Sequence, residues 1–105
     1  MLFRSVGGIR VDEPAADLAV IMALVSGLRD IPVESGLIAI GEVGLAGEVR
    51  AVTDIEKRIS EASRLGFAKI LVPHRNMAKI KPEKYTGIEI IPIKSVFEAL
   101  AYCKA

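Results

Sequence analysis

An apolar stripe on one predicted helix constrains this sequence more than any other feature. Large apolar side chains recur at spacings of three and four residues, at Leu18, Ile21, Met22, Val25 and Leu28. This spacing places them on one face of an α-helix of about four turns. An extended segment at residues 6–11 precedes the helix, Pro14 suits its first turn, and either Asp12 or Glu13 is placed to cap it. Because such a helix buries its apolar face on a sheet, we expect the rest of the chain to supply one.

The composition is that of one globular domain rather than a membrane protein. At 105 residues the chain is too short for two domains, and 51% of its residues are hydrophobic. Its longest apolar run, residues 18–25, is much shorter than the roughly 18 residues that a membrane span needs. The first five residues lack the pattern of a secretory signal, and a lone cysteine, Cys103, cannot form an internal disulfide. We therefore expect a cytoplasmic protein with no membrane partner.

The remaining strands follow from short apolar runs bounded by turn residues. Residues 37–43 form a nearly continuous apolar run, which indicates a strand covered on both faces, after a loop at 30–36. A tight connection at 44–47 and a returning strand at 48–52 predict a hairpin. Residues 68–72 form a buried strand that ends at Pro73. Residues 88–93 form another strand, in which Pro92 indicates a sheet edge or a strand end.

Two further helices begin at predicted capping boxes. In the first, Thr53 and Glu56 satisfy each other's backbone amides, and Gly66 ends the helix. In the second, Ser95 and Glu98 play these roles, and the helix continues to about Cys103. The side chains expected to pack are Ile55, Ile59, Ala62 and Leu65 in the first helix, and Val96, Phe97, Leu100 and Ala101 in the second. The predicted fold is one compact α/β (α+β) domain, with a mixed sheet packed by about three helices.

A basic segment is the main candidate for function, since no catalytic or metal-binding constellation is evident. Residues 1–66 carry seven basic and ten acidic side chains, whereas residues 67–105 carry seven basic and three acidic ones. Five cations lie within sixteen residues, at Lys69, Arg75, Lys79, Lys81 and Lys84, and only Glu83 opposes them. They lie in or beside a polar loop at residues 74–86, where we expect one helical turn and where His74 and Asn76 add donors. Such a cluster neutralises phosphates or is a solvated loop, and its single aromatic residue, Tyr85, argues against base stacking.

Two segments carry a resemblance to a known family. They are D-E-P-A-A-D-L-A at residues 12–19 and G-E-V-G-L-A-G-E-V-R at residues 41–50, and V-G-G-I-R-V at residues 6–11 fits the same pattern. Together they resemble the C-terminal domain of the RadA/Sms family of bacterial DNA repair proteins, over about residues 6–101. That domain is similar to the proteolytic domain of Lon proteases, so the resemblance implies a Lon-type fold.

The resemblance also implies that the Lon catalytic dyad is missing. Lon proteases carry their nucleophilic serine in a D-G-P-S-A-G motif, and Ala15 stands at that position here. The Lon lysine aligns with Glu56, while the neighbouring Lys57 points about 100° away around the helix. An alanine has no nucleophile to activate and a carboxylate cannot replace the lysine, so we expect no peptidase activity.

RadA/Sms proteins are hexameric, ATP-driven motors of branch migration, which implies DNA and copies of the same chain as partners. The family's zinc finger and ATPase would bind Zn, ATP and Mg, and neither is present in these 105 residues. We expect residues 1–5 to be a stub outside the family pattern, and 6–105 to be a Lon-like domain from a longer protein. Our first hypothesis is an inactive scaffold whose DNA contacts are Arg75, Asn76, Lys79, Lys81 and Lys84, and then Arg50, Lys57 and Arg58. The alternatives are a Lon-family peptidase-like or peptide-binding domain and a purely structural oligomerisation domain.

Overall fold

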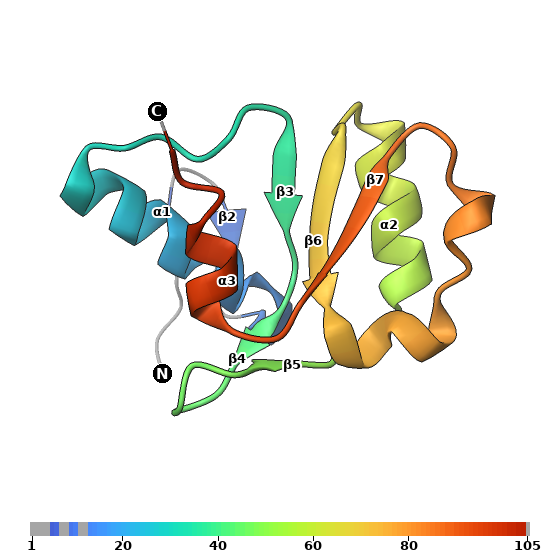
Figure 1. Ribbon diagram of the computed structural model, residues 1–105, viewed down its shortest axis with the longest axis horizontal. Helices are drawn as coiled ribbons and strands as arrows, with labels where there is room; N and C mark the ends of the chain where they lie inside the picture. Colours follow the sequence, from blue (N-terminus) through green and yellow to red (C-terminus); the bar gives the residue numbers. More distant parts are fainter. Residues whose placement is uncertain (1–4, 7–8, 11–12, 105) are drawn as a thin grey trace.

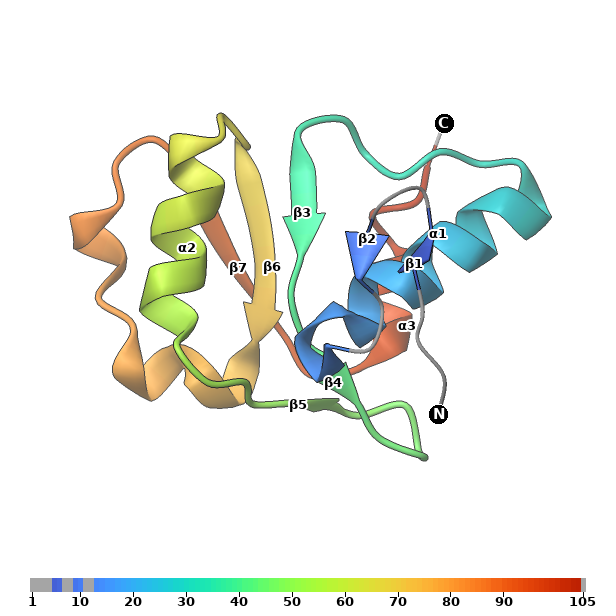
Figure 2. The same ribbon diagram turned by 180° about the vertical axis from the view of Figure 1, so that it is seen from behind.

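A parallel sheet separates the helices of this protein into two layers. In the computed structural model, which describes residues 5–6, 9–10 and 13–104, its strands are β3 (Leu37–Ala39), β6 (Lys69–Pro73) and β7 (Glu89–Ile93), in the order β3–β6–β7. Helices α1 (Asp17–Arg29) and α3 (Val96–Leu100) lie on one side of the sheet, and α2 (Ile55–Arg64) lies on the other (Figure 1). The view from behind shows the same arrangement (Figure 2). The predicted α/β architecture is confirmed.

Alternate residues of the sheet belong to two separate hydrophobic cores. Leu71 packs with Leu18 and Met22 of α1, whereas its neighbours Ile70 and Val72 pack with the α2 side chains. Because successive residues of a strand point to opposite faces, β6 is buried on both sides and reads as a continuous apolar run in the sequence. Pro92 lies in β7, at one edge of the described sheet, as predicted.

The hairpin is present, but the apolar run before it is not one strand. β4 (Glu42–Val43) and β5 (Val49–Arg50) pair antiparallel beside the parallel sheet. The run at 37–43 is divided because Gly41 bonds to other elements: its N–H donates to the Ala15 carbonyl, and its own carbonyl accepts from Leu18. A Cβ atom at Gly41 would lie 2.8 Å from Val49, so only glycine permits this approach.

The N-terminal strand also differs from the prediction. Residues 6–11 were expected to form one strand, but the described part forms β1 (Ser5–Val6) and β2 (Ile9–Arg10), which pair antiparallel. A 3₁₀ turn, η1 (Pro14–Ala16), then leads into α1. Glu13 occupies the cap position of this turn without a side-chain cap bond within the described residues, and Asp12 lies outside them.

One predicted capping box is confirmed in its serine cap only, and the other is wrong. Ser95 Oγ accepts from the Glu98 N–H at 3.3 Å. The Glu98 carboxylate accepts from the N–H of Lys94, the residue before Ser95, instead of from the N–H of Ser95 itself. At α2, however, the helix begins at Ile55 after Asp54, which has a left-handed φ of 56° and no side-chain cap bond. The chain thus enters the helix one residue later than a box starting at Thr53 requires. Gly66 does end α2, with φ of 93°.

The ends of the predicted apolar stripes lie in solvent. Leu28 is 86% exposed, Leu65 is 59% exposed and Phe97 is 81% exposed, in contrast to their predicted packing. Leu28 belongs to the last turn of α1, which projects beyond the sheet in Figure 1. Helix α3 ends at Leu100 rather than near Cys103, which leaves Ala101 exposed as well. Spacing alone predicted these positions, and it does not report how far the underlying sheet extends.

The segment after β6 is more ordered than expected. Two 3₁₀ turns, η2 (His74–Lys79) and η3 (Pro82–Lys84), replace the single predicted helical turn. Ile80, between them, is buried in the core beneath α2. Across the described part of the chain, the structure has no helix whose length and apolar character would let it cross a membrane.

Candidate nucleic-acid interface

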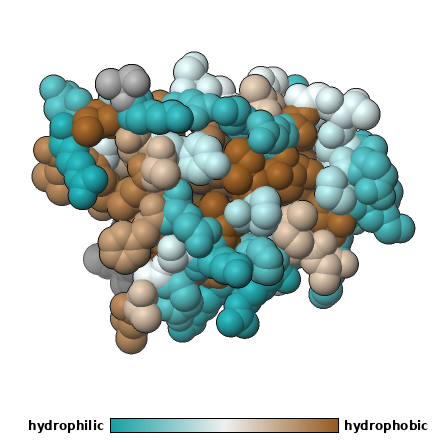
Figure 3. Space-filling view, in the orientation of Figure 1, coloured by the Kyte–Doolittle hydropathy of each residue, from teal (hydrophilic) through white to brown (hydrophobic). Residues whose placement is uncertain are grey.

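A basic groove lies where α2 begins and β6 ends. The groove has a volume of about 630 Å³, and its cations are Lys57 from the first turn of α2 and Arg75 and Lys79 from η2. All three cationic side chains belong to exposed residues. Asp54 and Glu56 also line the groove. In Figure 3, hydrophilic side chains gather in the middle of the lower margin, below the hydrophobic area at the centre of the molecule.

The floor of this groove is held by a buried amide. Asn76 is only 4% exposed, although Arg75 and Lys79 around it in η2 are exposed. The Val52 N–H donates to Asn76 Oδ1 at 3.0 Å, and Asn76 Nδ2 donates to the Val52 carbonyl at 3.0 Å. Because its carbonyl oxygen and its amino group both bind Val52, the Asn76 side chain is a weaker candidate for the predicted DNA contact than the exposed cations around it.

Sequence reasoning missed one cation of this region, Lys94. A second depression, of about 280 Å³, is lined by Lys94 together with His74, Arg75, Glu48 and Val49. The parallel register explains the meeting, since Pro73 pairs with Ile93 and the next residue of each strand leaves the sheet at the same edge. The sequence predicts that Lys94 lies near Arg75 only when the apolar runs at residues 68–72 and 88–93 are first paired as parallel strands.

Several predicted cations lie elsewhere. Lys81 lies just before η3 and Lys84 lies in it. Both are exposed, and they line neither depression. Lys69 begins β6, at the opposite end of the strand from η2, and donates to the Glu34 carboxylate at 2.5 Å. This hydrogen bond holds the pKa of Glu34 below its ordinary value and raises the pKa of Lys69. The run of five cations in sequence thus separates into three locations in space.

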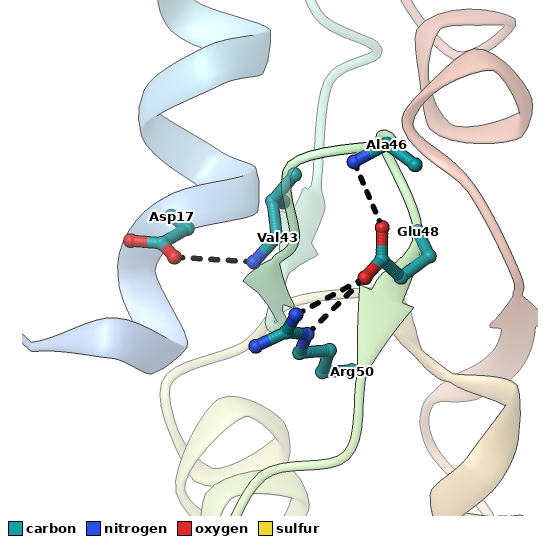
Figure 4. A network of polar contacts seen from close by, with 5 residues as sticks. All are labelled: Asp17, Val43, Ala46, Glu48 and Arg50. Carbon is teal, nitrogen blue, oxygen red and sulfur yellow. Dashed lines mark hydrogen bonds and ion pairs between the residues drawn. The ribbon is translucent and has the colours of Figure 1, made fainter.

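Two of the remaining predicted cations are held in ion pairs. Arg50 Nη2 donates to Glu48 Oε2 at 3.2 Å, and Glu48 Oε1 accepts from the Ala46 N–H within the same hairpin (Figure 4). The Glu48 carboxyl has a lowered pKa, chiefly because it accepts backbone N–H groups. Figure 4 also shows Asp17 accepting from the Val43 N–H, which ties α1 to the hairpin. Arg50 is consequently a weaker candidate for a phosphate than a cation without a neighbouring carboxylate.

Arg58 is the second paired cation, and it lines a cavity that is smaller than the basic groove. Its Nη2 donates to Glu13 Oε1 at 3.0 Å and its Nε donates to the Thr53 carbonyl at 2.9 Å. Both partners line, with Arg58 and Ala15, a cavity of about 210 Å³ next to the basic groove. Arg58 therefore links Glu13, which precedes η1, to Thr53, which precedes α2.

The two residues predicted to stand at the Lon dyad positions, Ala15 and Glu56, line two spaces that share one backbone segment. Ala15 is buried in η1 and lines the small cavity, while Glu56 lines the basic groove, and both spaces share residues 51–53. The Tyr85 hydroxyl donates to Glu56 Oε2 at 3.4 Å, which gives this carboxylate a structural partner other than the predicted capping box. The Ala15 methyl group offers no nucleophile. Among the residues that the structure describes, no group of three or more His, Cys, Asp or Glu side chains is placed to hold a metal ion.

Comparison with known proteins identifies the family. The family described as the Lon protease (S16) C-terminal proteolytic domain matches residues 4–103. The chain belongs to this family. The Lon-like domain is also similar to DNA repair protein RadA of Escherichia coli, with 47% identity over 96 residues, and to that of Bacillus subtilis, with 46% identity over 95 residues.

The similarity to RadA extends over nearly all of the Lon-like domain but only part of each relative. The matches cover 91% and 90% of this chain, and 20% of either relative. RadA of Streptococcus pneumoniae gives 43% identity over 97 residues, which are 92% of this chain and 23% of that protein. The resemblance to RadA seen in residues 12–19 and 41–50 is confirmed, and the chain spans about a fifth of the length of these relatives.

Proposed function

We propose that this Lon-like domain is an inactive, DNA-contacting scaffold within a RadA-type repair protein of the bacterial cytoplasm. One observation supports the DNA contact above all others: Lys57, Arg75 and Lys79 come from two separate elements and line one groove. Lys94 lies in the next depression, which Arg75 also lines. Cations that contact a phosphate backbone displace its counterions, so binding falls with salt.

The proposed lack of peptidase activity is supported by the residues at the dyad positions. Ala15 cannot attack a peptide carbonyl, and Glu56, which accepts a hydrogen bond from the Tyr85 hydroxyl, carries no amine that could take the role of the Lon lysine. A hexameric assembly is proposed from the resemblance to the RadA family. In this proposal the domain contributes binding surface to a motor and performs no chemistry of its own.

The first test is the anisotropy of labelled duplex and single-stranded DNA at several salt concentrations, with the oligomeric state measured by sedimentation in the same samples. We expect Arg75→Gln/Lys79→Gln to reduce the slope of log K against log salt for duplex DNA by about 2, since each phosphate contact contributes about 0.9.

The matched control is Lys81→Gln/Lys84→Gln, which removes the same charge from exposed positions outside the groove. The prediction from sequence that Lys81 and Lys84 contact DNA competes with the groove assignment, because the two lysines line neither depression, and this pair tests it as well. Equal slopes for the two double variants contradict the groove assignment, because total charge would then explain the binding. Salt-independent or undetectable binding by the wild-type domain contradicts the DNA-contacting function itself.

A further inference from the structure

Asn76 is the one buried residue within η2, and its surroundings differ from those of its neighbours. Arg75, Lys79 and His74 of this 3₁₀ turn are exposed, whereas Asn76 is 4% exposed. A buried side-chain amide is costly unless its polar groups are satisfied. Here both ends of the amide bond to one residue, Val52, at 3.0 Å each.

This pair of bonds joins two segments that lie 24 residues apart. Val52 lies between the end of β5 at Arg50 and the start of α2 at Ile55. The Asn76 amide accepts from the Val52 N–H and donates to the Val52 carbonyl, as the backbone of a residue in an adjacent strand would do. The start of α2, which carries Lys57, is thereby fixed against the turn that carries Arg75 and Lys79.

The turn itself needs such an attachment. A 3₁₀ helix has poorer hydrogen-bond geometry than an α-helix and is rarely longer than a few residues. With three residues per turn, Asn76 and Lys79 lie on the same side of η2, and both line the basic groove. A shift at Asn76 is therefore transmitted directly to Lys79 and to the adjacent Arg75.

We propose that Asn76 is a positioning residue, whose bonds to Val52 hold Arg75 and Lys79 at the separation from Lys57 that phosphate contact requires. This inference rests on the proposed function, and it adds a role for a side chain that touches no DNA. Without the two bonds, the three cations are still present, but Arg75 and Lys79 no longer keep a fixed position relative to Lys57.

The test measures DNA affinity and its salt slope for Asn76→Ala and for Asn76→Ser, a smaller change that is used if the alanine variant fails to fold. We expect about a fivefold to tenfold loss of duplex affinity at low salt and a slope reduced by about 1, because the displaced turn keeps only one of the two phosphate contacts made by Arg75 and Lys79. Faster hydrogen exchange at the Val52 amide would accompany this loss in the folded variant.

A control and a double-mutant cycle separate positioning from stability. Ile88→Val removes one methylene from the core beneath α2 without lining the groove, so it is expected to lower stability and leave the slope unchanged. In the Arg75→Gln/Lys79→Gln background, Asn76→Ala is expected to have no further effect on binding, because the residues it positions are gone.

The failure of this inference differs from the failure of the proposed function. A wild-type slope in folded Asn76→Ala or Asn76→Ser, or an undiminished effect in the double-variant background, overturns the positioning role while DNA binding stands. If the wild-type domain shows no salt-dependent binding, the proposed function falls, and the positioning role falls with it.

Discussion

Lys69 shows how the place of one residue along a strand decides what its charge does. In the sequence it is the first of five clustered cations, but in the structure it begins β6, far from η2. Its ammonium group donates to Glu34, and this bond is the largest cause of the lowered pKa of that carboxyl. The same bond raises the pKa of Lys69. The pair is a structural contact between the loop before β3 and the start of β6.

The Glu34–Lys69 pair predicts a specific dependence of stability on pH. A carboxyl whose pKa is lowered by folding stabilises the native state above its unfolded pKa, and that contribution disappears as pH falls through the folded pKa. The contribution from Lys69, whose pKa is raised, disappears only in strongly alkaline solution. We therefore expect Glu34→Gln to lower the urea midpoint at pH 7. The difference from wild type should shrink at an acidic pH, as the pH falls below the ordinary range of a carboxyl group and Glu34 becomes protonated in the folded state.

Glu83→Gln is the control for this series, because Glu83 is an exposed carboxylate in η3. Its urea midpoint should stay close to that of the wild type at both pH values. A difference between Glu34→Gln and wild type that persists unchanged at low pH would show that packing, rather than the ion pair, is responsible.

Single residues also mark the limit of prediction from sequence. Arg75, Lys79 and Lys57 were predicted because charge is visible in the sequence, and the structure brings them into one groove. Asn76 was predicted as a ligand-binding side chain, since nothing local reports that its amide meets Val52. Lys94 was missed because it joins Arg75 only through the parallel pairing of β6 with β7. Both differences arise from contacts between distant segments.

At the scale of elements, the sequence predicted those that local chemistry determines. The hairpin turn, the end of α2 at Gly66 and the edge position of Pro92 each depend on the residue at that place. The apolar run at 37–43 was predicted as one strand, but backbone bonds from Gly41 to Ala15 and Leu18 divide it. These bonds come from η1 and α1, so periodicity within the run contains no sign of them.

The two predicted capping boxes give a direct comparison of confirmed and wrong local chemistry. Ser95 caps α3 through its bond to the Glu98 N–H, so Ser95→Ala should reduce the free energy of unfolding by about 1 kcal/mol. Thr53 is exposed and does not cap α2, whose cap residue is Asp54. Thr53→Ala should therefore change the free energy of unfolding by less than about 0.5 kcal/mol.

Urea denaturation of the two variants, measured under identical conditions, checks this comparison. An equal loss for both variants would contradict the asymmetry and restore the capping box at Thr53. A loss of less than about 0.5 kcal/mol for Ser95→Ala would contradict the cap at α3.

At the scale of the whole molecule, two cores share one sheet. Leu71 belongs to the core under α1 and α3, and Ile70 and Val72, its neighbours in β6, belong to the core under α2. Neither layer of helices retains a surface to pack on if β6 leaves the sheet. Loss of one core therefore removes the support of the other, and we expect the domain to unfold in a single transition.

The two tyrosines report on the two cores separately and test this coupling. Tyr102 packs against the core under α1, and Tyr85 packs against the core under α2. Met22→Ala and Ile59→Ala each create a cavity in one core, and each should reduce the free energy of unfolding by about 2–5 kcal/mol. Leu28→Ala, at a side chain that is 86% exposed, should change it by less than about 0.5 kcal/mol.

Urea titrations followed by the NMR signals of Tyr85 and Tyr102 should give one midpoint for both rings in every variant. Separate midpoints in Met22→Ala, with Tyr102 released before Tyr85, would mean that β6 keeps its place with only one helical layer, so that the groove beside α2 survives without the α1 core.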